Sequence, residues 1–289
     1  MFSQFFGNYL LENQKITAEQ FDSCMNYIKA NRVKLGLIAE SEGLLTRTQA
    51  NELNYLQMQT DKRFGDLAVE KGYLTETDVN YLLSRQGNPY LIFIQSLEEG
   101  NILSREEIEQ SLAAFQQTNN YSDEVMEAIK NGNIEGMLPA FVEAENSRYL
   151  DLIALTLRSL VRFVSSYIRI GKGEFVTSVT AKAIACQHTI GDFNGFLGFC
   201  CDDKGILKIA DGYAKEEFPD VDEDALDSVG EFTNCVNGLY SAELSFQDII
   251  IDMRPPEYLF DASIEGHGDF YKLPVFVEGE KSDLIVKVG

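Results

Sequence analysis

The first third of this 289-residue chain is a repeated unit, and that repeat constrains the fold more than any other feature of the sequence. A Phe-Gly or Leu-Gly dipeptide recurs every 29 residues, at 6–7, 35–36 and 64–65. The same offset aligns three further sets of positions: Ile16, Leu45 and Leu74; Thr17, Thr46 and Thr75; Phe21, Ala50 and Val79. Units of this length stack on one another because none can bury its apolar face alone.

Each repeat has the sequence of a short helix, a turn and a longer helix. The aligned threonines precede amphipathic runs, and Glu19 and Glu76 fall in the first turn of two of them, as in capped helix N-termini. A fourth unit with Ser104 and Glu106 keeps the apolar positions but has Ile94 in place of the glycine. We therefore expect an all-helical domain over residues 1–118 in which each repeat stacks on its neighbours.

The composition is that of a globular protein long enough for two domains, with 45% hydrophobic residues. The chain opens without a basic leader and apolar stretch, so no secretory signal is expected. The most apolar segment, 150–170, is interrupted by Asp151, Arg158, Arg162 and Arg169, so we expect no membrane insertion. The expected location is the cytoplasm.

Cysteine and histidine are too sparse to predict a metal site. The five cysteines are Cys24, Cys186, Cys200, Cys201 and Cys235, and no two have Cys-x-x-Cys spacing. Only His188 and His267 supply imidazoles. We expect reduced, mostly buried thiols, no zinc and no cofactor of the chain's own.

Net charge argues against a nucleic acid polymer as partner. The formal charge is −22, and residues 119–289 hold 14 Lys/Arg against 30 Asp/Glu. Phosphate backbones require a basic surface. A free phosphate substrate would likewise need positive charge in this half of the chain.

The rest of the chain predicts an α+β fold. Residues 119–140 are expected to be a connector with one short helix at 123–130, and residues 141–289 a second domain in which helices pack on an antiparallel sheet. Helices are predicted at 141–168, 213–218 and 223–240. Strands are predicted at 175–180, 183–190, 195–201, 205–209, 248–253, 258–264, 269–277 and 284–288, with hairpin turns at 191–195 and 202–205.

The helix predicted around 227–238 has one core face and one displayed face. At about 100° per residue, Asp227, Glu231, Asn234 and Gly238 fall on one narrow stripe. The opposite face carries Leu226, Val229, Thr233, Val236 and Tyr240. Asn237 lies off the stripe and is expected to be structural. The stripe presents carboxylates, a carboxamide and a glycine that permits close approach of another surface.

This stripe resembles the active helix of the CheC, CheX and FliY chemotaxis phosphatases. Their pattern is Asp or Ser, three residues, Glu, two residues, Asn, then proline about twenty residues later. Asp227, Glu231 and Asn234 match it, and Pro255 and Pro256 follow. The motif occurs once, as in CheX-like members. A chance Glu-x-x-Asn at 143–146 lacks both the preceding acid and the later proline.

The resemblance implies hydrolysis of the aspartyl phosphate on a response-regulator receiver domain. Asn234 would orient the attacking water, Glu231 would engage the receiver's lysine, and Asp227 and Gly238 would contact the partner. Magnesium is expected on the receiver. Such relatives commonly dimerise, so a homodimer is expected. A non-catalytic scaffold that binds a receiver or docks to a secretion or pilus machine is the alternative, while a hydrolase with its own Ser or Cys nucleophile lacks a base.

The two middle repeats resemble the MshEN domain, a cyclic di-GMP-binding module of type II secretion and pilus ATPases. Each MshEN motif runs from Arg-Leu-Gly, through a second Gly seven residues after the first, to a closing Gln. Residues 34–57 and 63–86 match this spacing, with five residues between them. The resemblance implies nucleotide contacts from Lys34, Leu35, Gly36, Gln57, Arg63, Phe64, Gly65 and Gln86. Lys34 replaces the arginine of the first motif and offers a point charge rather than a bidentate fork.

Overall fold

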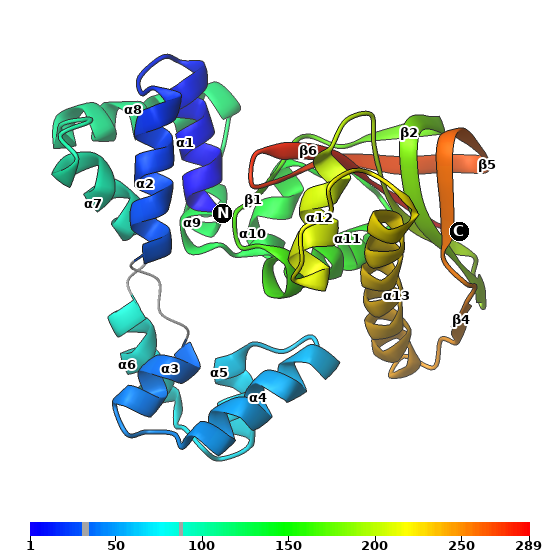
Figure 1. Ribbon diagram of the computed structural model, residues 1–289, viewed down its shortest axis with the longest axis horizontal. Helices are drawn as coiled ribbons and strands as arrows, with labels where there is room; N and C mark the ends of the chain where they lie inside the picture. The colour runs from blue at the N-terminus through cyan, green and yellow to red at the C-terminus, as the bar shows by residue number, and fades with distance from the viewer. Residues whose placement is uncertain (31–34, 87–88) are drawn as a thin grey trace. The chain divides into compact units, whose positions relative to one another are not determined.

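The computed structural model describes residues 1–30, 35–86 and 89–289. These residues divide into two compact units, Met1–Asn133 and Ile134–Gly289 (Figure 1). The stretch predicted to be a connector contains the helix α9 (Asp123–Asn131), which packs on the first unit's helices, and its last residues belong to the second unit. No helix in the described ranges has the length and apolar character needed to cross a membrane.

The first unit forms helix–turn–helix repeats, as predicted. Its remaining helices are α1 (Phe2–Glu12), α2 (Ala18–Ala30), α3 (Leu35–Ser41), α4 (Arg47–Gln59), α5 (Phe64–Glu70), α6 (Glu76–Gln86), α7 (Pro89–Glu99) and α8 (Arg105–Asn119). The repeated glycine packs against the apolar residue 14 positions later. A Cβ on Gly7 would stand 2.2 Å from the Phe21 ring, and one on Gly65 would stand 2.7 Å from Val79. The glycine therefore permits close helix packing within a repeat.

The longer helix of every repeat begins with the same reciprocal cap. In the second repeat the Thr46 hydroxyl accepts from the Gln49 backbone N–H, and the Gln49 side chain accepts from the Thr46 N–H. Equivalent pairs, Thr17 with Gln20, Thr75 with Asp78 and Ser104 with Glu107, start the other three helices. This cap satisfies two otherwise unpaired N–H groups at each start, which explains why Thr or Ser recurs there.

The repeats do not stack in sequence order. The second and third pack on each other around a core that includes Leu53, Phe64 and Leu82. The first packs mainly on the fourth, where Phe6 contacts the rings of Phe93 and Phe115. The prediction that each repeat stacks on its sequence neighbour is therefore wrong for the first and fourth repeats. These two pack on each other although the second and third repeats lie between them in the sequence.

The second unit places helices on an antiparallel sheet, which confirms the α+β prediction (Figure 1). Its helices are α10 (Ile134–Met137), η1 (Leu138–Ala140), α11 (Ser147–Ser159), η2 (Leu160–Val164), α12 (Gly205–Ala214) and α13 (Glu223–Ser245). Its strands are β1 (Ile168–Ile170), β2 (Glu174–Gly191), β3 (Gly195–Cys201), β4 (Ile251–Met253), β5 (Glu257–Val277) and β6 (Glu280–Val288).

The sheet order is β1-β5-β6-β3-β2-β4, and β5 also pairs with β2. Strands β2, β3, β6 and β5 are thus hydrogen-bonded in a ring. The core of this ring includes Ile184, Phe196 and Ile285. Helices α11, α12 and α13 pack on these strands, and α13 lies against β2. This contact positions the stripe predicted from the sequence.

Several predicted elements differ from the structure. Residues 205–209, predicted as a strand, begin α12, and the helix predicted at 213–218 has already ended by Lys215. The apolar run there suits either structure, and packing on α13 and β6 selects the helix. The strands predicted at 258–264 and 269–277 are one strand, β5, because β2 pairs with both parts of it. The helix predicted from 141 begins at Ser147, after the Asn146 cap.

Replacing Gly205 by alanine is expected to destabilise the second unit. A Cβ at this position would stand 1.7 Å from the Lys281 carbonyl oxygen, so the backbone must move. We expect the free energy of unfolding to fall by about 3 kcal/mol or more, measured by denaturant titration. Gly238→Ala is the matched control, because its Cβ would find only Met253 Cε, 3.9 Å away. That change should raise stability by up to about 1 kcal/mol; equal losses in both variants would contradict this prediction.

Candidate functional site

Helix α13 has the core face predicted from its sequence. Asp222 caps its start by accepting a hydrogen bond of 3.0 Å from the Ala225 N–H. Glu223 and Asp224 in the first turn complement the helix dipole. The predicted core residues Leu226, Val229, Thr233, Val236 and Tyr240 are all buried. The helix is therefore fixed on α12 and β2 through this face.

The opposite face carries the predicted stripe. Asp227 and Glu231 are exposed, and Asn234 and Gly238 are partly buried. A Cβ on Gly238 would meet little, so the glycine leaves open surface beside Asn234. Glu231 is accessible to an approaching cation, whereas the Asn234 side chain is only partly accessible.

Asp227 is held in place by a tyrosine from the sheet. The Tyr258 hydroxyl donates to Asp227 Oδ1 over 2.8 Å. The Tyr258 ring lies over Gly230, where a Cβ would stand 2.5 Å from it. Burial, and then the hydrogen bond to Asp227, raise the pKa of Tyr258 above its ordinary value. The hydroxyl stays protonated at neutral pH and remains a donor, so its hydrogen bond fixes the orientation of the Asp227 carboxylate.

A chain of three carboxamides leads from the helix interior to Asn234. Asn237 Nδ2 donates to Gln187 Oε1, and Gln187 Nε2 donates to Asn234 Oδ1, each over 2.8 Å. Gln187 Nε2 also donates to the Arg254 carbonyl over 2.8 Å. Gln187 and Asn237 are 1% and 2% exposed, so these bonds are shielded from water. Asn237 thus lies buried, off the displayed stripe, as the helix period predicts.

The two prolines of the motif follow this carbonyl directly. Arg254, Pro255 and Pro256 join β4 to β5, and the Arg254 N–H donates to the His188 carbonyl over 2.9 Å. The proline ring restricts both its own φ and the conformation of the residue before it. The segment therefore holds one backbone carbonyl against Gln187.

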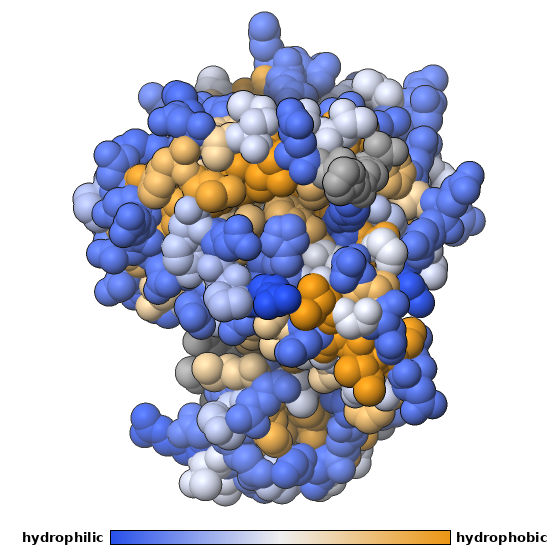
Figure 2. Space-filling model, turned by 90° about the vertical axis from the view of Figure 1, so that its right-hand side faces the viewer, coloured by the Kyte–Doolittle hydropathy of each residue, from blue (hydrophilic) through white to orange (hydrophobic). Residues whose placement is uncertain are grey.

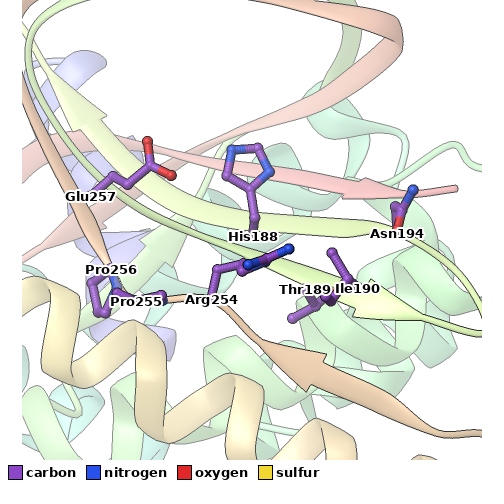
Figure 3. A pocket seen from close by; sticks show the side chains of 8 residues that line it. All are labelled: His188, Thr189, Ile190, Asn194, Arg254, Pro255, Pro256 and Glu257. Carbon is purple, nitrogen blue, oxygen red and sulfur yellow. The ribbon is translucent and has the colours of Figure 1, made fainter.

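A hollow of about 570 Å³ lies beside this segment. His188, Thr189, Ile190, Asn194, Arg254, Pro255, Pro256 and Glu257 line it (Figure 3). His188 projects from β2 on the face opposite Gln187, since successive strand residues alternate. Asn234 is not among the lining residues. The hollow and the stripe therefore share the Arg254 backbone but are separate surfaces.

Apolar side chains lie exposed near the C-terminal end of α13. Phe246, Ile250 and Met253 are 90%, 72% and 36% exposed. Figure 2, which faces the side where β4 and β5 lie, shows apolar patches among polar side chains. Gly238 lies next to Met253. The Gly238 end of the stripe therefore lies beside an exposed apolar side chain, that of Met253.

The residues implied by the MshEN resemblance lie in the second and third repeats. Arg63 is exposed directly before α5, and Gln57 is partly buried near the end of α4. Phe64 is 8% exposed, and its ring stands 3.2 Å from where a Gly36 Cβ would lie. Leu35 packs on the same core, and Gly65 packs on Val79. Lys34 and the Gln86 side chain lie outside the described residues.

The cysteines are free thiols, as predicted, and all except Cys235 are buried. Burial raises the pKa of Cys186 and of Cys200 to about 12, which keeps these thiols protonated and poorly nucleophilic at neutral pH. Within the described part of the chain, no three His, Cys, Asp or Glu side chains are grouped to hold a metal ion.

Gln187, Tyr258 and Arg254 are the site residues that sequence reasoning missed. None belongs to the motif, and Gln187 precedes Asn234 by 47 positions. One local feature marks Gln187, because it is the polar residue that follows the apolar run 183–186 in β2. The carbonyl of Arg254 is marked only by its place directly before the proline pair.

Comparison with known proteins supports a resemblance over the second unit. Residues 183–268 match the family model of CheX, described as chemotaxis phosphatase CheX. No curated protein matches the chain.

Three solved structures each align with about half of the chain. The chemotaxis protein CheX from Desulfovibrio desulfuricans is 14% identical with a TM-score of 0.43, and the alignment covers 50% of this chain and 100% of that one. A CheC-like superfamily protein from Shewanella sp. PV-4 is 20% identical with a TM-score of 0.44, and the alignment covers 50% of this chain and 99% of that one. The matching chain of the CheX–CheY–BeF3–Mg complex from Borrelia burgdorferi is 17% identical with a TM-score of 0.41, and the alignment covers 48% of this chain and 96% of that one.

Proposed function

We propose that this chain removes phosphate from the aspartyl phosphate of a receiver domain of the CheY type. The observation that carries the proposal is the displayed stripe of α13, where Glu231 is exposed and Asn234 is held by Gln187. The family match supports it, because residues 183–268 contain the whole stripe and the proline pair.

The proposed chemistry is hydrolysis assisted by positioning. The receiver's own magnesium and lysine stabilise the charge of the transferring phosphoryl group. Asn234 enters the receiver's site and orients a water molecule, while Glu231 pairs with the receiver's lysine. The water oxygen bonds to phosphorus and the bond from phosphorus to the aspartate oxygen breaks, so inorganic phosphate leaves with the protons of the water and the receiver aspartate becomes a free carboxylate again. Correct placement of the water lowers the barrier without requiring a perturbed pKa.

The acidic surface is consistent with a partner that supplies the positive charge. The half of the chain that carries the stripe has an excess of 16 carboxylates over Lys and Arg. A carboxylate-rich surface attracts a protein that displays a lysine and a bound cation, and salt screens that attraction. The cation and the general electrostatic stabilisation come from the partner.

The test is loss of phosphate from a phosphorylated receiver, with and without this protein. Acceleration supports the phosphatase. A receiver that binds without acceleration favours the alternative, a non-catalytic receiver-binding or docking scaffold. A homodimer is part of the proposal, and sedimentation of the full chain tests it.

For the first unit we propose cyclic di-GMP as ligand. Arg63 is exposed before α5, where its guanidinium can meet phosphate or guanine edges bidentately. Phe64, Leu35, Gly36 and Gly65 shape the helical core that presents this arginine, and Gln57, Lys34 and Gln86 complete the proposed contact set.

Cyclic di-GMP is expected to bind the wild-type chain in isothermal titration, and Arg63→Ala should weaken that binding about tenfold or more. Arg47→Ala is the matched control, since Arg47 is exposed at the start of α4 and is not one of the proposed contacts. Absence of heat with the wild type would remove the sensor proposal and leave a docking module. Repeating the phosphatase assay with the nucleotide then measures any coupling between the units.

A further inference from the structure

We infer that Gln187 is a positioning residue that sets the direction in which the Asn234 carboxamide faces. This inference rests on the proposed function, because the direction matters only if Asn234 meets a water molecule in the receiver. It assigns a role to a buried side chain on β2, outside the motif.

The direction of the whole amide chain follows from one backbone carbonyl. The Arg254 oxygen can only accept, so the Gln187 atom that faces it must be the donor Nε2. Gln187 Oε1 then faces Asn237, which must present Nδ2. The second Nε2 hydrogen of Gln187 meets Asn234, which must present Oδ1. All three amide orientations are thereby determined.

The anchor is rigid. The Arg254 N–H donates to the His188 carbonyl, and Pro255 restricts the conformation of Arg254. Turning Gln187 over would set its oxygen against the Arg254 oxygen and its amino group against that of Asn237. Gln187 and Asn237 are almost completely buried, so no water relieves those contacts. The proline pair thus acts on Asn234 through Gln187.

The consequence is a defined set of free atoms on Asn234. One lone pair of Oδ1 is used by Gln187, which leaves both Nδ2 hydrogens and the second Oδ1 lone pair for the receiver site. A carboxamide free to turn would offer these groups in either order. Fixing the order removes unproductive orientations before the partner arrives, which is how positioning raises a rate.

Gln187→Glu tests this directly, because the ionised carboxylate keeps the shape of glutamine but donates no hydrogen bond. We expect phosphate release at saturating receiver to fall on the order of 10- to 100-fold, with receiver affinity unchanged. Protonating the introduced carboxyl restores one donor, so the ratio of variant to wild-type turnover should rise as pH falls. Burial raises the pKa of such a carboxyl toward the accessible range.

Gln187→Met is the second variant, of similar length and without a titrating group. The ratio of its turnover to that of wild type should be lowered by the same factor at every pH. In an Asn234→Ala background, neither substitution should lower turnover further. Ser228→Ala is the control for a lost buried bond on α13, since Ser228 donates to the Ala210 carbonyl and does not touch Asn234. Its turnover should match wild type.

The outcomes separate the two proposals. If wild type and Asn234→Ala release phosphate equally, the proposed function fails. If they differ but Gln187→Glu and Gln187→Met match wild type, only this inference fails. Should both variants unfold, side-chain amide exchange in the wild type decides: the Gln187 Nε2 protons should exchange slowly and the Asn234 Nδ2 protons fast, and equal exchange overturns the inference.

Discussion

Asn234→Ala is expected to lower receiver dephosphorylation on the order of 100-fold while the protein stays folded. The side chain is partly buried and accepts one hydrogen bond from Gln187. The free energy of unfolding should fall by the cost of leaving the Gln187 donor unpaired, and by about 1 kcal/mol or less in addition. Helix α13 keeps its core face, because that face does not include Asn234. The measurement is phosphate release from a phosphorylated receiver in single turnover, with thermal unfolding run in parallel.

Asn194→Ala is the matched control for this variant. Asn194 is an exposed asparagine in the turn between β2 and β3 of the same unit. Its side chain takes no part in the hydrogen bonds that join Gln187 to α13. It should release phosphate at the wild-type rate. Turnover that is unchanged in Asn234→Ala would remove Asn234 from the site and leave the stripe as a contact surface.

Glu231→Ala is expected to weaken receiver affinity about tenfold and to lower the rate at saturating receiver as well. The exposed carboxylate is free to pair with a lysine, and pairing both strengthens the complex and fixes the angle at which Asn234 enters. Affinity is measured by titrating a labelled receiver, and rate by phosphate release at saturation. Because the surface is strongly acidic, the affinity difference should shrink as salt rises.

Two further variants sharpen this result. Glu231→Gln keeps the shape of the side chain and removes the charge, so it should resemble Glu231→Ala in affinity. Glu145→Ala removes one charge from the exposed loop before α11 and should leave both quantities unchanged. An equal loss in Glu145→Ala would show that net charge, rather than Glu231, governs binding.

The sequence predicted the motif helix well because its information is local. A helix repeats every 3.6 residues, so Asp227, Glu231 and Asn234 fall on one face whatever surrounds them, and Val229 and Val236 fall on the other. The caps of the repeats are local for the same reason. Each joins residues three positions apart, as Thr46 and Gln49 do.

What the sequence did not predict depends on contacts between distant residues. The run after Gly205 has apolar spacing compatible with a strand, and it becomes α12 because it packs on α13 and comes within van der Waals contact of Lys281. Gln187 meets Asn234 because β2 lies under α13. No pattern within either segment contains that pairing.

The nested order of the repeats has a consequence for how the first unit folds. The second and third repeats are neighbours in sequence, so their mutual contacts close short loops and cost little chain entropy. The first and fourth repeats must instead bring Phe6 to Phe93 and Phe115 across the whole intervening segment. Prior collapse of the inner pair shortens the effective length of that segment, which lowers the entropy lost when the outer pair meets. The inner pair is therefore expected to gain protection from hydrogen exchange before the outer pair during refolding.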